Sequence, residues 1–256
     1  MQAYSEARAH DLGAALATLA DPAPSAGLAP GSGLESEFFS RLTIKSEAGD
    51  WAGILSDARG LESLQQKYPG VRDAVMARIV PLIAHAQARL GEFSAAERVI
   101  ATTPGDCEPC LQTRARIAEL QGQTARADWW FARAEAIAPS LPFARAAWGQ
   151  ALLERGRPDA AIAQFTTANQ KGPHFADPLE GWGEALMAKN QSHLALAKFA
   201  EAEKYAPNWG RLHLKWGEAM VYAGKKDEAK AQFTRAAQLD LTPAEKAELA
   251  RQSTHA

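Results

Sequence analysis

Residues 142–175 read PFARAAWGQALLERGRPDAAIAQFTTANQKGPHF, and the two following stretches of equal length repeat the same pattern of side chains. The pair Trp148-Gly149 returns as Trp182-Gly183 and again as Trp216-Gly217, in two steps of 34 residues. The same step connects Ala161, Ala195 and Ala229, then Phe165, Phe199 and Phe233, then Ala168, Ala202 and Ala236. Because a fixed period of this length is typical of stacked repeats, the sequence predicts a repeat architecture rather than one globular core.

Each repeat contains two stretches with helical spacing, separated by a short break. Trp148 and Leu152 stand four residues apart, as on the buried face of a helix, and Gly156 and Pro158 interrupt this first stretch. Glycine can adopt a positive φ at a helix end, and proline suits the first position of the next helix. We expect Phe165 to fill the space between neighbouring repeats. The helix backbones are expected to approach closely at three small residues, Gly149, Ala161 and Ala168.

These residues resemble the tetratricopeptide repeat (TPR), a helix-turn-helix unit of the same length. The family has a small residue on its first helix and a glycine in the turn, which are Gly149 and Gly156 here. Its second helix carries an alanine, an aromatic residue and another alanine, and a proline follows; these are Ala161, Phe165, Ala168 and Pro173. Asn190 replaces the turn glycine in the next repeat, a mild departure because asparagine tolerates left-handed backbone. The resemblance implies an all-α fold, a right-handed α-solenoid of stacked TPR helix-turn-helix repeats with capping helices.

The repeat match also suggests how the chain is organised. We expect an N-terminal helix over residues 1–20 and a Pro/Gly/Ser-rich loop or linker over 21–34. Degenerate TPR-like repeats are expected over 35–107 and four well-matched repeats over 108–241. A C-terminal capping helix with a tail is expected over 242–256. The capping helix is expected because Thr242-Pro243-Ala244-Glu245 has the residues of a helix start.

Composition narrows the class of partner. The 256 residues are 46% hydrophobic, which suffices for a substantial core, and the net charge of −2 gives no reason to expect nucleic-acid binding. No run of about 18 apolar residues is present, so we expect no membrane-spanning helix. The first residues carry Glu and Asp where a signal peptide has basic residues, so a cytoplasmic location is the default expectation.

Cys107 and Cys110 are the only cysteines and form a Cys-Glu-Pro-Cys motif before a predicted helix. A helix N-terminus favours a reactive thiolate, whereas Asp106 and Glu108 favour the protonated thiol. A zinc site needs about four ligands, and no second cluster of Cys or His completes one. We interpret the pair first as structurally incidental thiols. A disulfide or redox-sensitive clip is the alternative, and a metal site follows after it.

Other features of enzymes are missing from the sequence. The six histidines are scattered, and none stands at a metal-binding spacing or beside a recognisable nucleophile. Neither a Gly-x-Gly-x-x-Gly motif nor a Gly-Lys-Ser/Thr loop occurs. We therefore expect no enzymatic activity and no cofactor.

The TPR resemblance implies that the first helix of each repeat lines a concave groove. Carrying the family's groove positions onto this sequence, with one adjacent tyrosine, gives Gln112, Arg116, Phe143, Gln150, Glu180, Glu184, Met187, Arg211, Leu214, Glu218 and Tyr222. The three glutamates favour a basic or mixed-charge segment, to which Met187, Leu214 and Tyr222 would add apolar contact. The alternative is that these glutamates only solvate the surface.

The sequence thus predicts a protein–protein interaction scaffold or adaptor that binds a peptide or a partner helix. One alternative is a thiol-based redox or metal-responsive module centred on Cys107 and Cys110. Another is a structural repeat protein that self-associates through a surface such as Trp209.

Overall fold

A computed structural model describes residues 32–59, 73 and 75–254 of the chain, and every regular element in these residues is a helix. The helix expected over residues 1–20 lies outside the described residues, as does most of the linker expected over 21–34. The described part begins with α3 at Ser32, so the last three residues of that expected linker are helical. The chain divides into two compact units between Pro139 and Ser140.

In its described residues, the N-terminal unit (residues 32–139) contains three helix pairs and a π-helix. Its elements are α3 (Ser32–Glu47), α4 (Trp51–Ala58), a π-helix η2 (Val75–Ile79), α7 (Val80–Arg89), α8 (Phe93–Ala101), α9 (Glu108–Leu120) and α10 (Thr124–Ile137). Within this unit α9 packs against α10 and α7 against α8, so each helix lies beside its neighbour in sequence.

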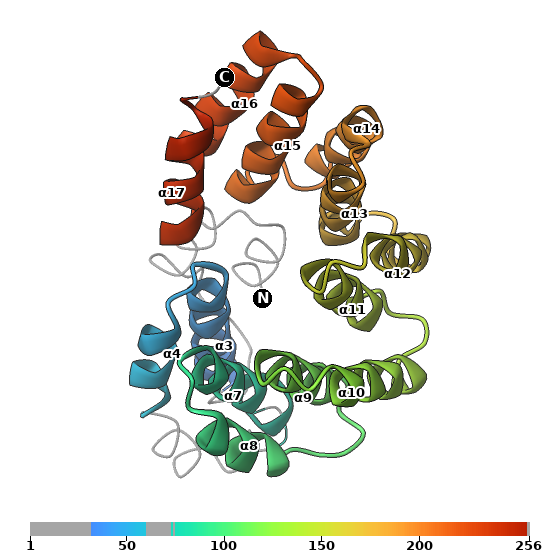
Figure 1. The fold of residues 1–256 in the computed structure, drawn as a ribbon. Coiled ribbons are helices and arrows are strands. Elements are labelled where there is room, and N and C mark those ends of the chain that lie inside the picture. Colours follow the sequence, from blue (N-terminus) through green and yellow to red (C-terminus); the bar gives the residue numbers. More distant parts are fainter. Residues whose placement is uncertain (1–31, 60–72, 74, 255–256) are drawn as a thin grey trace. The chain divides into compact units, whose positions relative to one another are not determined.

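The C-terminal unit (residues 140–254) contains three further pairs and a single last helix. Its elements are α11 (Phe143–Glu154), α12 (Pro158–Lys171), α13 (Ala176–Ala188), α14 (Ser192–Glu203), α15 (Gly210–Tyr222), α16 (Lys226–Ala237) and α17 (Pro243–Gln252). Figure 1 shows α13 beside α14 and α15 beside α16, and α17 packs on both α15 and α16.

The turn inside each pair has the same backbone geometry throughout. The residue after the first helix has a positive φ, which is 69° at Gly156, 57° at Asn190 and 78° at Gly224. The next amide donates back to the helix, as Arg157 does to the Leu152 carbonyl at 2.9 Å. This is the hydrogen bond of a Schellman helix end, which needs a residue that tolerates left-handed backbone. The expectation that Asn190 takes the place of the turn glycine is confirmed.

The core of each helix pair in the C-terminal unit is a phenylalanine ring against a glycine. Phe199 is fully buried, and a Cβ built on Gly183 would lie 2.6 Å from its ring. Phe165 meets Gly149 in the same way and also closes on Gly181 of the following pair, where a Cβ would lie 2.4 Å from the ring. The ring therefore joins one repeat to the next, as expected from the period of the sequence.

The last helix begins as its sequence predicts. The Glu245 amide donates to Thr242 Oγ1 at 3.3 Å, and the Thr242 amide donates to Glu245 Oε2 at 2.8 Å. These two bonds form a capping box. Together with the helix pairs and their turns, they confirm the predicted fold class, an all-α stack of TPR-type repeats. None of the helices in the described ranges combines the length and apolar character needed to cross a bilayer.

Candidate functional site

Arg211 connects three helices of the C-terminal unit. It lies near the start of α15, and its Nε donates to Glu180 Oε1 on α13 at 3.0 Å. Its guanidinium also donates to Glu184, one turn further along α13, and lies 3.6 Å from Glu245 Oε1 on α17. Because α13, α15 and α17 follow one another in the C-terminal unit, side chains on neighbouring helices of this series meet.

Lys215 forms a second set of contacts one helical turn after Arg211. Its Nζ donates to Glu218 Oε2 at 3.2 Å within α15 and to Glu248 Oε1 on α17 at 2.6 Å. We call the complete set the charge network, and it consists of Glu180, Glu184, Arg211, Lys215, Glu218, Glu245 and Glu248. With every group ionised, five carboxylates face two cations, a formal surplus of three negative charges.

The pKa values of Glu180 and Glu184 on α13 are shifted in opposite directions. Burial is the main cause that raises the pKa of Glu180 well above its usual range, the neighbouring Glu184 adds to it, and Arg211 opposes it. Burial also acts to raise the pKa of Glu184, but Arg211 and a hydrogen bond from Glu180 outweigh it and lower that pKa. The arrangement is a carboxylic acid that donates to a carboxylate, because two close carboxylates do not both ionise readily.

Glu218 and Glu248 form a second pair of this kind. Burial raises the pKa of Glu218 to about 7 against the charge of Lys215, and a hydrogen bond to Glu248 adds to the shift. Among the described donors, none reaches the buried Oε1 of Glu218. An ionised Glu218 therefore leaves a buried oxygen unsatisfied, whereas a proton shared with Glu248 removes that cost.

The charge network changes the picture of an open acidic groove wall. Glu180 is only 3% exposed and is bound by Arg211, and Glu218 is bound by Lys215, so the glutamates neither stand free nor merely solvate the surface. Sequence reasoning missed Lys215, Glu245 and Glu248. One signal was available, because Arg211 and Lys215 stand four residues apart on one helix just as Glu180 and Glu184 do.

Leu214 is not a groove residue. It is 0% exposed and packs with Phe233 and Leu241 in the core of the last helix pair. The chain leading into α17 covers this side of α15, which is why a position expected to be open is filled. Trp209, expected as a surface for self-association, is half-buried and packs against the cluster around Leu212.

The other expected groove residues differ in exposure. Tyr222 is 71% exposed at the end of α15, and Met187 is half-buried at the end of α13. Phe143 lies exposed at the start of α11, with its ring edge-on to Phe175 at 5.4 Å between centroids. Gln150 donates to Glu154 at 3.1 Å on the same helix.

Two of the expected groove residues belong to the N-terminal unit. Gln112 on α9 donates to Glu108, and Arg116 is exposed one turn further on. Arg116 acts on His85 of α7, where burial is the main cause that lowers the pKa of the imidazole to about 3, followed by Arg116 and then Arg89.

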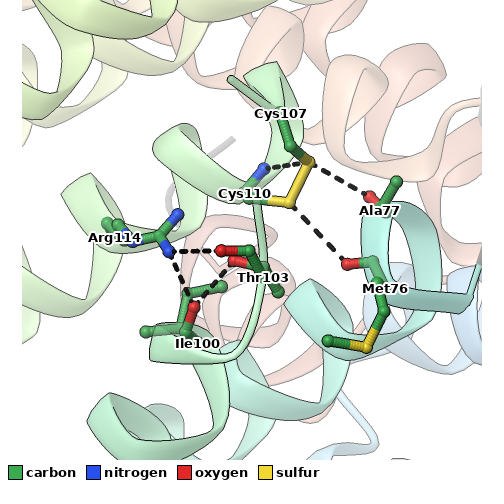
Figure 2. Close-up of a disulfide and its surroundings, with 7 residues drawn as sticks. All are labelled: Met76, Ala77, Ile100, Thr103, Cys107, Cys110 and Arg114. Carbon is green, nitrogen blue, oxygen red and sulfur yellow. Dashed lines mark hydrogen bonds between the residues drawn. A yellow bond between two sulfur atoms is a disulfide. The ribbon is translucent and has the colours of Figure 1, made fainter. Parts of the chain in front are cut away.

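Cys107 and Cys110 form a disulfide, which Figure 2 shows at the start of α9. Cys107 is the N-cap residue of this helix, and the Cys110 amide donates to Cys107 Sγ at 3.3 Å. The interpretation of the pair as incidental thiols is therefore wrong, and the disulfide alternative describes the structure.

Comparison with known proteins gives likenesses of the backbone. Neither the models of known protein families nor the curated proteins match the chain. Among solved structures, it is similar to MamA AMB-1 at 19% identity and a TM-score of 0.48, over 61% of this chain and 95% of that one. MamA MSR-1 gives 19% identity and a TM-score of 0.46, over 66% of this chain and 97% of that one. YrrB, described as a TPR protein with an unusual peptide-binding site, gives 13% identity and a TM-score of 0.48, over 70% of this chain and 92% of that one.

At these identities the likenesses concern the course of the backbone only. The assignment of the fold rests on this chain's own period of 34 residues, its left-handed turn residues and its contacts between phenylalanine and glycine. On these grounds, each of the two units is, in its described residues, a stack of TPR-type helix-turn-helix repeats.

Proposed function

We propose that this protein is a protein-interaction scaffold or adaptor whose C-terminal unit binds a basic or mixed-charge segment of a partner. The binding face is formed by α13, α15 and α17. The observation that carries the proposal is the charge network, in which five carboxyl groups surround two cations. Even with one proton on each of the two glutamate pairs, three carboxylates face two cations and one negative charge remains in excess. A surplus of one sign over a small area attracts a partner of the opposite sign and speeds encounter.

The charge network is partly accessible to solvent. The side chains of Arg211 and Glu248 are 28% and 27% exposed, whereas those of Glu180 and Glu218 lie deeper. A lysine or arginine side chain that approaches Glu248 can therefore interact with the carboxylates without first opening the core. Its charge favours the ionised form of Glu218, so binding near neutral pH releases the proton that Glu218 shares with Glu248.

Apolar side chains stand beside the charge network on the same helices. Met187 follows Glu184 by three residues on α13, and Tyr222 follows Glu218 by four on α15. Residues three or four apart lie on one face of a helix, so both belong to the face that carries the glutamates. A segment that alternates basic and apolar residues would match this face, and Tyr222 offers the large, rigid contact common at binding sites.

The proposal is tested with three synthetic peptides of equal length in which Lys/Arg, Glu or Gln alternate with Leu and Tyr. Fluorescence anisotropy measures their binding to the full chain and to Glu248→Gln. The control is Glu228→Gln on α16, which removes a carboxylate paired only with its neighbour Lys225. We expect the basic peptide alone to bind, with roughly threefold to tenfold weaker binding to Glu248→Gln and in raised salt.

Two results would count against the proposal. Equal binding of the acidic peptide would remove the electrostatic basis, and equal weakening by Glu228→Gln would move the site away from the charge network. Calorimetry of the basic peptide in buffers of different ionisation enthalpy measures protons directly. Proton release at pH 7 that is absent in Glu218→Gln is the expected result.

A further inference from the structure

The disulfide between Cys107 and Cys110 closes a loop of only four residues. A disulfide stabilises a fold mainly by restricting the unfolded chain, and the restriction grows with the length of the loop it closes. A disulfide that closes so short a loop contributes little to the stability of the fold. The surroundings of the two sulfurs instead favour thiol–disulfide exchange.

The two sulfurs differ in access. Cys110 is fully buried in the first turn of α9, whereas Cys107 is partly exposed at the N-cap. Exchange proceeds by attack of a thiolate along the axis of the disulfide bond, so an incoming thiol can reach only a sulfur that solvent reaches. Cys107 is therefore the sulfur that meets another molecule, and Cys110 is the one displaced.

The start of α9 favours a thiolate at Cys107. The amide of Cys110 donates to Cys107 Sγ at 3.3 Å, and the sulfur lies at the positive end of the helix dipole. The adjacent carboxylates of Asp106 and Glu108 oppose this effect. Glu108, however, is buried and accepts a hydrogen bond from Gln112 on the same helix, and this bond offsets part of the effect of its charge on Cys107.

The reduced pair also has partners in place. Figure 2 shows the carbonyl groups of Met76 and Ala77 facing the two sulfurs. The Met76 oxygen lies 3.8 Å from Cys110 Sγ, and the Ala77 oxygen lies 3.7 Å from Cys107 Sγ. Both belong to the π-helix η2, a local widening that is frequent at functional sites. After reduction each thiol can donate to one of these carbonyls, so the dithiol form has hydrogen-bond acceptors in place.

The loop that precedes Cys107 is held in place. The Arg114 guanidinium, one turn after Cys110, donates to the Ile100 carbonyl at 2.8 Å and to the Thr103 carbonyl at 3.2 Å. Thr103 in turn donates its hydroxyl to Ile100 at 2.7 Å. The end of α8 is thereby fixed to α9, and the position of Cys107 does not depend on the disulfide alone.

We propose that Cys107 and Cys110 form a dithiol–disulfide exchange site for thiol-bearing proteins, in which Cys107 exchanges and Cys110 resolves. The thiolate of a partner attacks Cys107 Sγ, the bond between the two sulfurs breaks, and Cys110 leaves as a thiolate that takes a proton. A second thiolate of the partner then attacks the partner's sulfur in the mixed disulfide, and Cys107 leaves as a thiolate that also takes a proton. The partner gains a disulfide, and the site gains two thiols. The site lies in the N-terminal unit and does not depend on peptide binding by the C-terminal unit.

The reverse half-reaction offers the cleanest test. The full chain and its variants Cys110→Ser and Cys107→Ser are reduced, freed of reductant and mixed with oxidised glutathione, and intact mass is followed with time. We expect Cys110→Ser to collect one glutathione on Cys107 about tenfold faster than Cys107→Ser collects it on Cys110. The wild-type protein should return to its internal disulfide with no lasting adduct, because Cys110 displaces the glutathione.

The alternative to exchange is an inert structural bridge. Equal rates for the two variants, with circular dichroism showing both folded, would overturn the assignment of roles. A measurement without any substitution covers the case of a misfolded variant. Wild-type protein is equilibrated in glutathione buffers of graded ratio, and free thiols are counted after alkylation. A bridge that stays closed in the folded protein at every ratio, including millimolar dithiothreitol, would overturn the proposal.

Discussion

The C-terminal unit and the first two helix pairs of the N-terminal unit use the same turn but fill their cores differently. Nine residues after the left-handed residue, the position is Phe165, Phe199 or Phe233 in the C-terminal unit. The equivalent positions are Ile100 after Gly91 and Ala58 after Gly49. Where the ring is missing at this position, a hydrophobic cluster that includes Phe39, Ile54 and Ile79 forms the core instead. The turn thus sets the backbone of a repeat, while the core admits more than one solution.

The two units also place buried titratable groups in opposite settings. In the C-terminal unit, Glu218 keeps a proton that an exposed glutamate would lose, because burial and Glu248 favour the neutral acid. In the N-terminal unit, His85 stays neutral where an exposed histidine would be charged, because burial, Arg116 and Arg89 disfavour the cation. One unit therefore holds an extra proton at mildly acidic pH, and the other holds one fewer.

The largest effect is expected where a helix glycine faces a buried phenylalanine ring. Gly183→Ala places a Cβ 2.6 Å from the Phe199 ring, and we expect a loss of about 2–3 kcal/mol in urea unfolding followed by circular dichroism. Gly105→Ala in the N-terminal unit is the matched control, because a Cβ there meets no atom within 4 Å. The pair Gly183→Ala/Phe199→Leu should recover part of the loss. A neutral Gly183→Ala would mean that the ring does not set the spacing between the helices.

The next largest effect concerns stability, which is expected to depend on pH with opposite sign in the two units. A raised pKa at Glu218 contributes stability that is complete below pH 4.5 and is lost as pH rises through about 7, on the order of 2 kcal/mol. A lowered pKa at His85 contributes stability that is complete above pH 6.5 and is lost as pH falls toward 3. Raising pH from 5 to 8 should therefore weaken the C-terminal unit and strengthen the N-terminal unit.

Hydrogen exchange with mass spectrometry on the full chain separates the two responses, after correction for the intrinsic effect of pH. Glu218→Gln should flatten the response of α13, α15 and α17, and His85→Phe should flatten that of α7 and α9. Lys215 and Glu248 face Glu218, and Arg89 and Arg116 act on His85. These four charged residues are left unchanged in both variants, so that only the titrating group is removed. A response of the same sign in both units would contradict the assignment of either group.

The smallest effect concerns the turn that both units share. Asn190 has a φ of 57°, and Asn190→Ala should cost about 1 kcal/mol because alanine lacks the short polar side chain with which asparagine stabilises left-handed backbone. Gly91, with a φ of 82°, should respond to Gly91→Ala by a similar amount in the N-terminal unit. Thermal unfolding of both variants, with Asn190→Gly as the tolerated change, measures the two turns. Clearly unequal losses would show that the surrounding core, and not the turn itself, decides the cost.

The sequence alone determined the features that depend on near neighbours along the chain. The left-handed residues at Gly156 and Asn190, the capping box of Thr242 and Glu245, and the repeated spacing of Phe165 and its equivalents were all predictable. Each involves contacts within a few residues or a period that copies one local unit. Such signals survive in a single sequence because the same backbone geometry demands the same residue type each time.

Tertiary structure decided which side chains meet across helices. The period placed Glu180, Glu184 and Glu218 on one type of helix, but only the stacking of α13, α15 and α17 brought Arg211 and Lys215 between them. It also buried Leu214. Charge compensation and proton sharing depend on burial and on distances of a few ångströms between residues some 30 positions apart. A local pattern carries no such distances.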